Sequence, residues 1–305
     1  MTAAMERGVR RLSAASSRKV IEPDVSVAGE VGDGQVLADE LLSVVGLPLA
    51  ADLTAEQRRR LSREEVAAIA EEGIRFEAAL LAGFGLEISR AADLTDPRVT
   101  YLLHELGEET RHSRLFVRLI GQLAPTARNP FNKGALGAVK RVVVRSIMGK
   151  PALLCVLVLA GEEIPDLLQK LSAEHPDTDP FLRDVNRYHR HEEARHLAFA
   201  RMVLPELWAK ASWWERFRVR YQAPLLIENM FDMLVHPGVY AAIGLPGWAT
   251  WWAVKQTPER LALRHLATRP VAEAMVAAGV LPGRRLPWAW RRLVGASSVL
   301  AEVDE

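Results

Sequence analysis

The stretch Tyr188–Phe199, "YHRHEEARHLAF", places three histidines, two glutamates and two arginines within twelve residues. On an α-helix each residue advances by about 100°, so that, measured from His189, Glu193 lies at about +40° and His196 at about −20°. These three side chains therefore share one narrow face of a helix. The spacing His-x-x-x-Glu-x-x-His offers three metal ligands that point in one direction.

The other titratable residues of this stretch point elsewhere. His191 and Arg195 fall on the opposite side of the helix, where a solvated charge run explains them, and Glu192 lies at the edge of the ligand face. The zinc-protease pattern His-Glu-x-x-His does not fit, because His191-Glu192 is followed by an arginine at position 195.

A second segment, "GEETRH", carries the same element as Glu109-x-x-His112, and Leu102, Leu106 and Phe116 flank its face. Glu109 precedes the glutamate of the first element by 84 residues. Two Glu-x-x-His elements on separate helices of a bundle are typical of a dinuclear carboxylate site, in which two other helices each add a glutamate. The pattern therefore predicts one further glutamate before each element.

Glu77 lies 32 residues before Glu109, among apolar residues in "IRFEAALLAGF". Burying a carboxylate there is costly unless it is paired or metal-bound. Glu71 and Glu72 are competitors, but they lie about a turn earlier and next to more charge. Glu77 is therefore the predicted ligand.

The second half offers Glu162, 31 residues before Glu193, in "LVLAGEEIPDLL". Glu163 is the alternative, but the spacing of 31 is closer to the 32 of the first half and favours Glu162. Pro165 removes a hydrogen bond to the carbonyl of Gly161, which predicts a kink beside the ligand.

Four carboxylates and three imidazoles suit iron or manganese better than zinc or copper. Glutamates that bridge hold two metals close together, and two Fe(II) ions can deliver two electrons to O2. The predicted ligands are Glu77, Glu109, His112, Glu162, His189, Glu193 and His196.

Helical periodicity dominates the chain and predicts an all-α fold. Ser62 and Glu65 form a capping box that predicts the first helix start, and Asp96 with Pro97 predicts the second. We expect one domain, 1–305, with a four-helix bundle and extra N- and C-terminal helices. Its parts are an N-terminal arm (1–60), a metal-binding bundle (62–210) and a helical extension (211–305). The bundle helices are expected at about 62–89, 97–123, 151–172 and 180–210, with a shorter helix at 135–148.

Composition excludes several classes. The formal net charge is +1, so there is no basic field for nucleic acid. The longest apolar run, near 151–160, is about half of what spans a bilayer. The basic start lacks an apolar signal region, and the single cysteine, Cys155, fits a reducing cytosol. A cytoplasmic protein without a membrane span is expected.

The seven residues resemble the metal motif of the p-aminobenzoate N-oxygenases (AurF-like) of the ferritin-like superfamily. The histidine four residues before the second Glu-x-x-His separates this family from ferritins, acyl desaturases and ribonucleotide reductase small subunits. The resemblance covers about 10–295, with "RLSAASS", "LTAEQRRRLSREE" and "HPGVYAAIGLP" in support. It implies a ferritin-like fold and a cytosolic, usually dimeric diiron enzyme. Such an enzyme uses O2 and an external electron donor to oxidise the nitrogen of an aromatic amine.

Two alternatives remain open. A fatty-acyl desaturase or hydroxylase is disfavoured by His189 and would be favoured by a long apolar tunnel. A non-enzymatic ferritin-like iron store would assemble into a shell. The eight tryptophans, all after residue 207, either line a substrate route or pack in the core or an interface, and packing is favoured.

Overall fold

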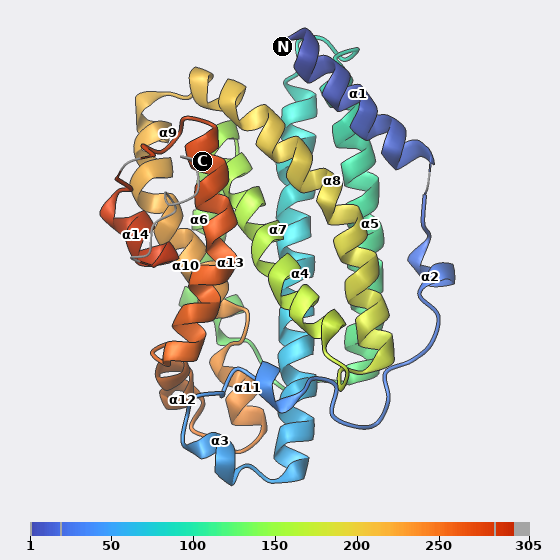
Figure 1. Cartoon of the computed structure of the whole chain (residues 1–305), viewed down its shortest axis with the longest axis vertical. Coiled ribbons are helices and arrows are strands. Elements are labelled where there is room, and N and C mark those ends of the chain that lie inside the picture. The colour runs from blue at the N-terminus through green and yellow to red at the C-terminus, as the bar shows by residue number, and fades with distance from the viewer. Residues whose placement is uncertain (1, 19, 284, 296–305) are drawn as a thin grey trace, which may run out of the picture.

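The protein is described by a computed structural model covering residues 2–18, 20–283 and 285–295. Within these residues the regular structure is helical, with no strand. Four long helices form the bundle along the vertical axis of Figure 1: α4 (Ala55–Ser89), α5 (Pro97–Leu123), α7 (Pro151–Glu174) and α8 (Pro180–Lys210). Helix α4 packs against α5, and α7 packs against α8. The all-α bundle predicted from the sequence is confirmed.

The starts of α5 and α8 follow from local chemistry. Asp96 accepts a hydrogen bond from the Arg98 amide at 2.9 Å, and Asp179 accepts one from the Leu182 amide at 3.0 Å. A proline follows each aspartate at the first helical position, where its missing N–H costs nothing. These caps fix the predicted starts at residues 97 and 180.

The predicted start of the first bundle helix is wrong. Helix α4 begins seven residues earlier, where Thr54 and Gln57 form the capping box. Ser62 and Glu65 lie inside the helix and are buried, and they bind the preceding segment instead. Ser62 Oγ accepts from the Val36 amide at 3.0 Å, and Glu65 accepts from the Ser43 amide at 3.1 Å. The segment before α4 is thereby tied to its first turns.

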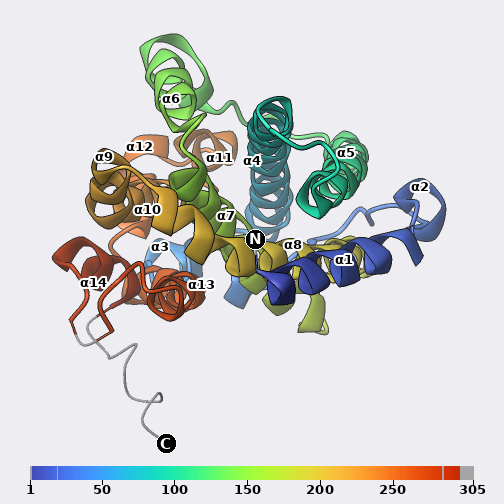
Figure 2. The same cartoon turned by 90° about the horizontal axis from the view of Figure 1, so that it is seen from above.

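The first part of the predicted arm is a helix, in agreement with the extra N-terminal helices expected from the sequence, which did not give its bounds. Helix α1 (Ala3–Arg18) lies along α5 and α8, as Figures 1 and 2 show. Val9 is fully buried on its inner side, and Gly8 allows close approach because an added Cβ would lie 2.6 Å from Met202 Cε. Short elements complete the arm: α2 (Pro23–Ser26), η1 (Asp39–Leu41) and α3 (Leu49–Asp52).

A crossover links the two helix pairs, and further helices follow the bundle. The crossover contains η2 (Pro130–Asn132) and α6 (Gly134–Ile147), which stands out from the bundle in Figure 2.

Helices α10 and α13 pack against α7. None of the described helices is long and apolar enough to cross a membrane. The C-terminal elements are α9 (Trp213–Phe217), η3 (Arg218–Gln222), α10 (Ala223–Met233), α11 (Pro237–Ala242), α12 (Gly247–Val254), α13 (Pro258–Ala277) and α14 (Trp288–Val294).

Two hydrophobic clusters leave a polar layer between them. On α4, Ala70 belongs to one cluster and Leu80 to the other, with Glu77 between them. On α8, Tyr188 and Leu197 bound the segment that carries the histidines in the same way. The packing therefore places the predicted ligands at one level of the bundle, closed by apolar side chains above and below.

Helix α7 meets α4 closely at Gly161. A Cβ at this position would overlap the Phe76 ring, so the glycine is required by the contact between the two helices. The helix continues through Pro165 to Glu174. The kink expected at Pro165 stays a prediction.

Candidate metal centre

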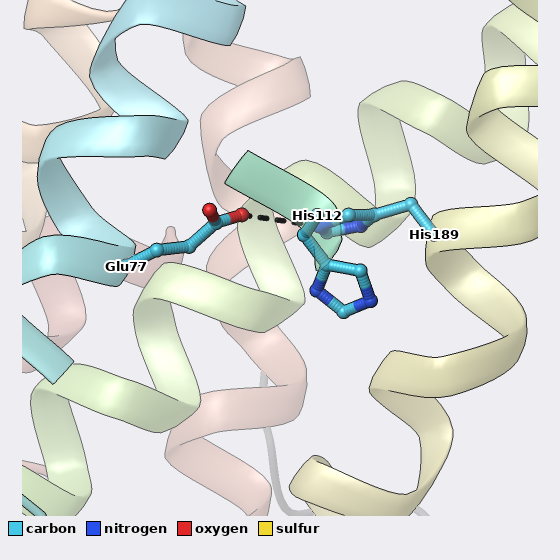
Figure 3. Close-up of side chains that lie close together, drawn as sticks. All are labelled: Glu77, His112 and His189. Carbon is cyan, nitrogen blue, oxygen red and sulfur yellow. Dashed lines mark ion pairs between the residues drawn. The ribbon is translucent and has the colours of Figure 1, made fainter. Parts of the chain in front are cut away.

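All seven predicted ligands are buried, with at most 4% of each residue exposed. Three groups of side chains bring their donor atoms within 4.8 Å of one another. Figure 3 shows Glu77, His112 and His189 converging from α4, α5 and α8. The groups are Glu77 with His112 and His189; Glu109 with His112 and Glu193; and Glu105 with Glu109 and His196.

Glu109 and Glu193 each contact both histidines of the Glu-x-x-His elements. Glu109 lies 3.2 Å from His112 Nδ1 through Oε2 and 3.2 Å from His196 Nδ1 through Oε1. Glu193 lies 3.1 Å from His112 Nδ1 through Oε1 and 2.9 Å from His196 Nδ1 through Oε2. A carboxylate that offers one oxygen to each side has the geometry of a bridge between two ions.

His189 is directed into the same cluster. Its Nε2 lies 3.4 Å from Glu193 Oε1 and 3.7 Å from Glu77 Oε1, while its Nδ1 lies 3.0 Å from Gln169 Oε1. The Gln169 oxygen can only accept, so Nδ1 donates and Nε2 keeps its lone pair for the cluster. Ser113 donates a hydrogen bond to the second oxygen of Glu77.

Glu162 and Glu163 have different surroundings. Burial raises the pKa of Glu162 well above its ordinary value, and the charges of Glu193 and Glu109 raise it further. Glu163 instead forms an ion pair with Arg201. Glu162 lies outside the three close groups but faces the same carboxylates, which supports it over Glu163 as the proposed ligand.

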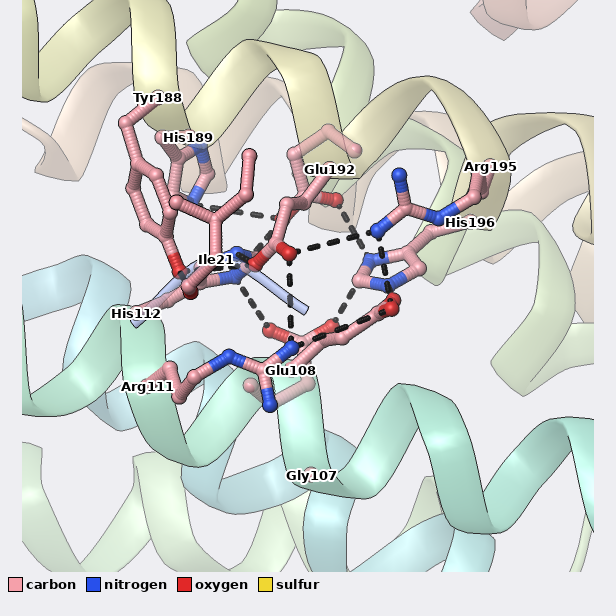
Figure 4. A network of polar contacts seen from close by, with 12 residues as sticks. Ile21, Gly107, Glu108, Arg111, His112, Tyr188, His189, Glu192, Arg195 and His196 are labelled. Atoms are coloured by element: carbon pink, nitrogen blue, oxygen red, sulfur yellow. Dashed lines mark hydrogen bonds and ion pairs between the residues drawn. The ribbon is translucent and has the colours of Figure 1, made fainter. Parts of the chain in front are cut away.

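A second layer of charges orients the histidines (Figure 4). His112 Nε2 donates to Glu192 at 3.0 Å, and His196 Nε2 donates to Glu108 at 2.8 Å. Each carboxylate comes from the helix opposite its histidine. Arg195 donates to Glu108 at 2.9 Å and contacts Glu192 at 3.4 Å. Such partners fix the ring orientation and the tautomer of a ligating histidine.

The prediction that Arg195 is a solvated residue is wrong. Only 14% of its side chain is exposed, because it joins the two carboxylates. Arg111 occupies the matching place on α5 and lies 3.4 Å from Glu192. The sequence does contain a signal for this second layer, because the pattern Glu-Glu-x-Arg-His occurs both at 108–112 and at 192–196. His191 is exposed, as predicted.

Glu105 is a second residue of the cluster that was not predicted from the sequence. It is 1% exposed and joins Glu109 and His196 in one of the close groups. Glu105 lies four residues before Glu109, just as His189 lies four residues before Glu193. The internal repeat therefore indicated this position, although with a different residue type.

Comparison with known families agrees with this geometry. The family model "P-aminobenzoate N-oxygenase AurF" matches residues 2–279. The chain belongs to this family. AurF proteins form a ferritin-like diiron family, which confirms the resemblance and the fold class inferred from the sequence. 

Uncharacterized proteins of Mycobacterium bovis and of two strains of Mycobacterium tuberculosis are 28% identical to the chain over 170 residues. The match covers 55% of this chain and 49% of each relative, so the chain spans about half the length of these relatives.

The residues present fit the two metal ions of the AurF family. One carboxylate oxygen of each of Glu77, Glu109 and Glu193 is buried and, among the described residues, faces imidazole nitrogens without forming a hydrogen bond of good geometry. Burial alone would lower the pKa of His112, but its bonds to Glu109 and other carboxylates raise that pKa well above the ordinary value. Buried, unpartnered carboxylate oxygens require cations, and two divalent ions would balance the four proposed glutamate ligands.

A cavity of about 860 Å³ reaches this AurF-type cluster. Glu77, Glu162 and His189 form part of its wall, and aliphatic side chains from α4, α6, α7 and α10 form most of the remainder. None of the tryptophans, all within the described residues, lines it. Trp208, Trp251 and Trp290 are buried in the apolar clusters, which agrees with the packing role favoured from the sequence.

Proposed function

We propose that the protein is an O2-dependent diiron oxygenase that oxidises the nitrogen of an aromatic amine. The observation that carries the proposal is His189, whose Nε2 points at Glu77 and Glu193 while Gln169 holds its other nitrogen. This third imidazole adds a neutral donor to the four carboxylates and two histidines that ferritin-like diiron sites share. Membership of the AurF family supports the same reaction class.

The proposed ligands are the seven residues predicted from the sequence. Glu109 and Glu193 would span the two ions, because each faces both His112 and His196. Two iron ions held there would supply electrons for the reduction of O2, and manganese is the alternative with similar ligand preference. Glu108 and Glu192 keep the histidine rings in position.

The proposed reaction balances as one amine, one O2, two electrons and two protons giving one hydroxylamine and one water. An N–O bond forms, the O–O bond breaks, and an external electron donor supplies the two electrons. The nitrogen must arrive with its lone pair free, so the amine must be unprotonated. An aromatic amine meets this condition near neutral pH, whereas an alkyl amine is mostly protonated there.

We propose a cytoplasmic homodimer as the working form. A single cysteine, Cys155, which is buried, supports a reducing compartment. An apparent mass of two chains in solution would support the dimer, whereas a shell of many chains would support an iron store.

The test uses iron-reconstituted, reduced protein exposed to labelled O2 with a panel of substituted anilines. We expect about two irons per chain and one labelled oxygen in the hydroxylamine product, with further oxidation to nitroso or nitro compounds. His191→Ala is the matched control, because His191 lies on the exposed side of the same helix. Absence of labelled product with every aniline, despite two bound irons, would refute N-oxidation.

A second candidate is oxidation of an acyl or alkyl chain, as in a desaturase or hydroxylase. The aliphatic wall of the cavity favours it. The same experiment separates the two reactions, because an oxidised acyl chain together with untouched anilines would select this candidate.

A further inference from the structure

The cavity beside the cluster is long. Its wall on α4 runs from Glu65 to Leu80, which corresponds to about 22 Å at 1.5 Å per residue. Glu77 lies near one end of this stretch, and Glu65 lies about 18 Å away along the helix. On α4 the proposed ligand therefore lies near one end of the wall, and a short substrate at Glu77 would leave the part toward Glu65 unfilled.

The wall between these ends offers apolar contacts. Most of its residues are apolar, and they come from the arm before α4 and from helices of the bundle, the crossover and the C-terminal part. A volume of about 860 Å³ is near the upper end of the range for small-molecule sites. Representative wall residues are Ile69, Leu80, Leu157, Val158, Leu168 and Met230.

The wall offers no net positive charge to an anionic substrate. Among the described residues its cations are Arg75, Lys140 and Arg260. Lys140 Nζ lies 2.6 Å from Glu72, and Arg75 lies 3.9 Å from the same carboxylate. Arg260 donates to the Phe231 carbonyl at 3.2 Å, and its guanidinium lies 4.1 Å from the Phe231 ring centroid.

Acidic side chains match or exceed these cations even without the proposed ligands. Glu40, Glu65, Glu72 and Glu259 also line the cavity. A substrate carboxylate entering this chamber would lose its hydration and meet a wall with more glutamates than cations, two of which already face Glu72. A small aminobenzoate anion therefore fits the wall poorly in both charge and length.

We infer that the substrate is an uncharged aromatic amine with a long apolar chain, its nitrogen at the Glu77–His189 end and its chain along α4 toward Glu65. This inference rests on the proposed N-oxygenase function. Unlike a free aminobenzoate, such a substrate has no carboxylate. Its apolar chain extends beyond the ring by at least about the length of two helical turns of α4.

Binding to the iron-reconstituted protein under nitrogen tests this directly. Equilibrium dialysis compares 4-alkylanilines from ethyl to octyl, and 4-aminobenzoate with its ethyl ester. Each added methylene should tighten Kd roughly fourfold, since a buried methylene is favourable by about 0.8 kcal/mol. The ester should bind at least tenfold more tightly than the acid. A Kd that does not change with chain length, or an acid that binds more tightly than its ester, overturns the inference.

A substitution tests where the alkyl chain of the substrate lies in the cavity. Ala70 lines the cavity seven residues before Glu77, about 10 Å away along α4. Ala70→Leu should weaken octylaniline binding at least tenfold and leave ethylaniline unchanged. The matched control is Ala78→Leu, because Ala78 is exposed and does not line the cavity. Equal weakening of both anilines places the chain elsewhere and refutes the assigned path.

Two outcomes separate this inference from the proposed function. If long anilines bind with the expected dependence but gain no oxygen, the chamber is assigned correctly and N-oxidation is refuted. If 4-aminobenzoate is oxidised and outcompetes the long anilines, N-oxidation holds and the substrate class is wrong. The wild-type series decides the class even if Ala70→Leu does not fold.

Discussion

The two helix pairs of the bundle carry nearly the same polar pattern with one difference. Glu-Glu-x-Arg-His occurs on α5 at 108–112 and on α8 at 192–196. Four residues before the second glutamate, α5 has Glu105 and α8 has His189. Both side chains are buried against the shared carboxylates.

The difference correlates with access to the cavity. His189 lines the 860 Å³ chamber, whereas Glu105 does not. The two halves therefore share the residues that hold their histidines and differ where one half meets the substrate space. In the proposed function the repeat would hold the metal ions, and its exception would mark the side that meets the substrate.

The largest effects should come from the two carboxylates that the halves share. Glu109→Ala and Glu193→Ala each remove a side chain that faces both His112 and His196. We expect metal content after dialysis to fall from about two per chain to below one in both variants. Glu163→Gln is the control, since Glu163 pairs with Arg201, and it should retain both metals. Retention of two metals by either alanine variant would show that its glutamate is not shared.

Replacing the differing residues should affect one metal each. His189→Ala should weaken the ion beside Glu77, and Glu105→Ala should weaken the ion beside His196. Under metal-limited dialysis we expect about one retained metal in each variant. Optical spectra of the cobalt-substituted proteins would identify which ion is kept. His191→Ala should match the wild type, and identical spectra for the His189 and Glu105 variants would mean that the two positions are not distinct.

A smaller effect is expected in the layer that the halves have in common. Glu108→Gln and Glu192→Gln remove the anionic acceptors of His196 and His112. Such changes typically cost 10–100-fold in metal affinity, with stoichiometry retained at excess metal. Chelator competition measures both constants. A tenfold difference between the two variants would contradict the equivalence of the two outer layers.

The smallest effect concerns Glu65, which lies in the part of α4 that extends beyond the length of α7. Replacing Glu65 should leave metal binding unchanged. Twelve residues before Glu77, α4 still contains Glu65, whereas the position twelve residues before Glu162 precedes α7. Burial raises the pKa of Glu65 from 4.5 to about 7, although hydrogen bonds from Ser43 oppose the rise. The folded state therefore holds this proton more tightly than the unfolded state.

The contribution of Glu65 to the free energy of unfolding is fully present below the pKa that Glu65 has in the unfolded state. It is lost as the pH rises toward 7. Between pH 5 and pH 8 the wild type should lose about 2 kcal/mol relative to Glu65→Gln, since one pKa unit corresponds to about 1.4 kcal/mol. Urea unfolding at both pH values measures this. Parallel pH profiles for the two proteins would show that Glu65 is ionised in the folded chain.

Local sequence signals predicted the parts of the fold that local chemistry determines. Asp96 and Asp179, each followed by a proline, gave helix starts that the structure confirms. The start of α4 was missed because two capping patterns follow each other, and the one containing Ser62 is used for contacts with the arm. The sequence predicted extra N-terminal helices without the bounds of α1, because the burial of that helix depends on distant helices.

The same division applies to the metal cluster. Helical periodicity selected the five proposed ligands of the two Glu-x-x-His segments, and the matched spacing of the two halves selected Glu77 and Glu162. Arg195 could not be placed in this way, since its partner Glu108 lies on another helix. Glu105 required a comparison of the two halves at one position. The cavity depends on side chains from the arm and from helices of all parts of the fold, and no single segment encodes it.

The crossed contacts between histidines and glutamates have a consequence for maturation of the protein. His112 is held by a glutamate of α8 and His196 by a glutamate of α5, through bonds that contain no metal. These two bonds join the helices at the level of the cluster as soon as the chain folds. We therefore expect folding to precede metallation, so that apoprotein can wait in a competent form and its activation can follow the supply of metal.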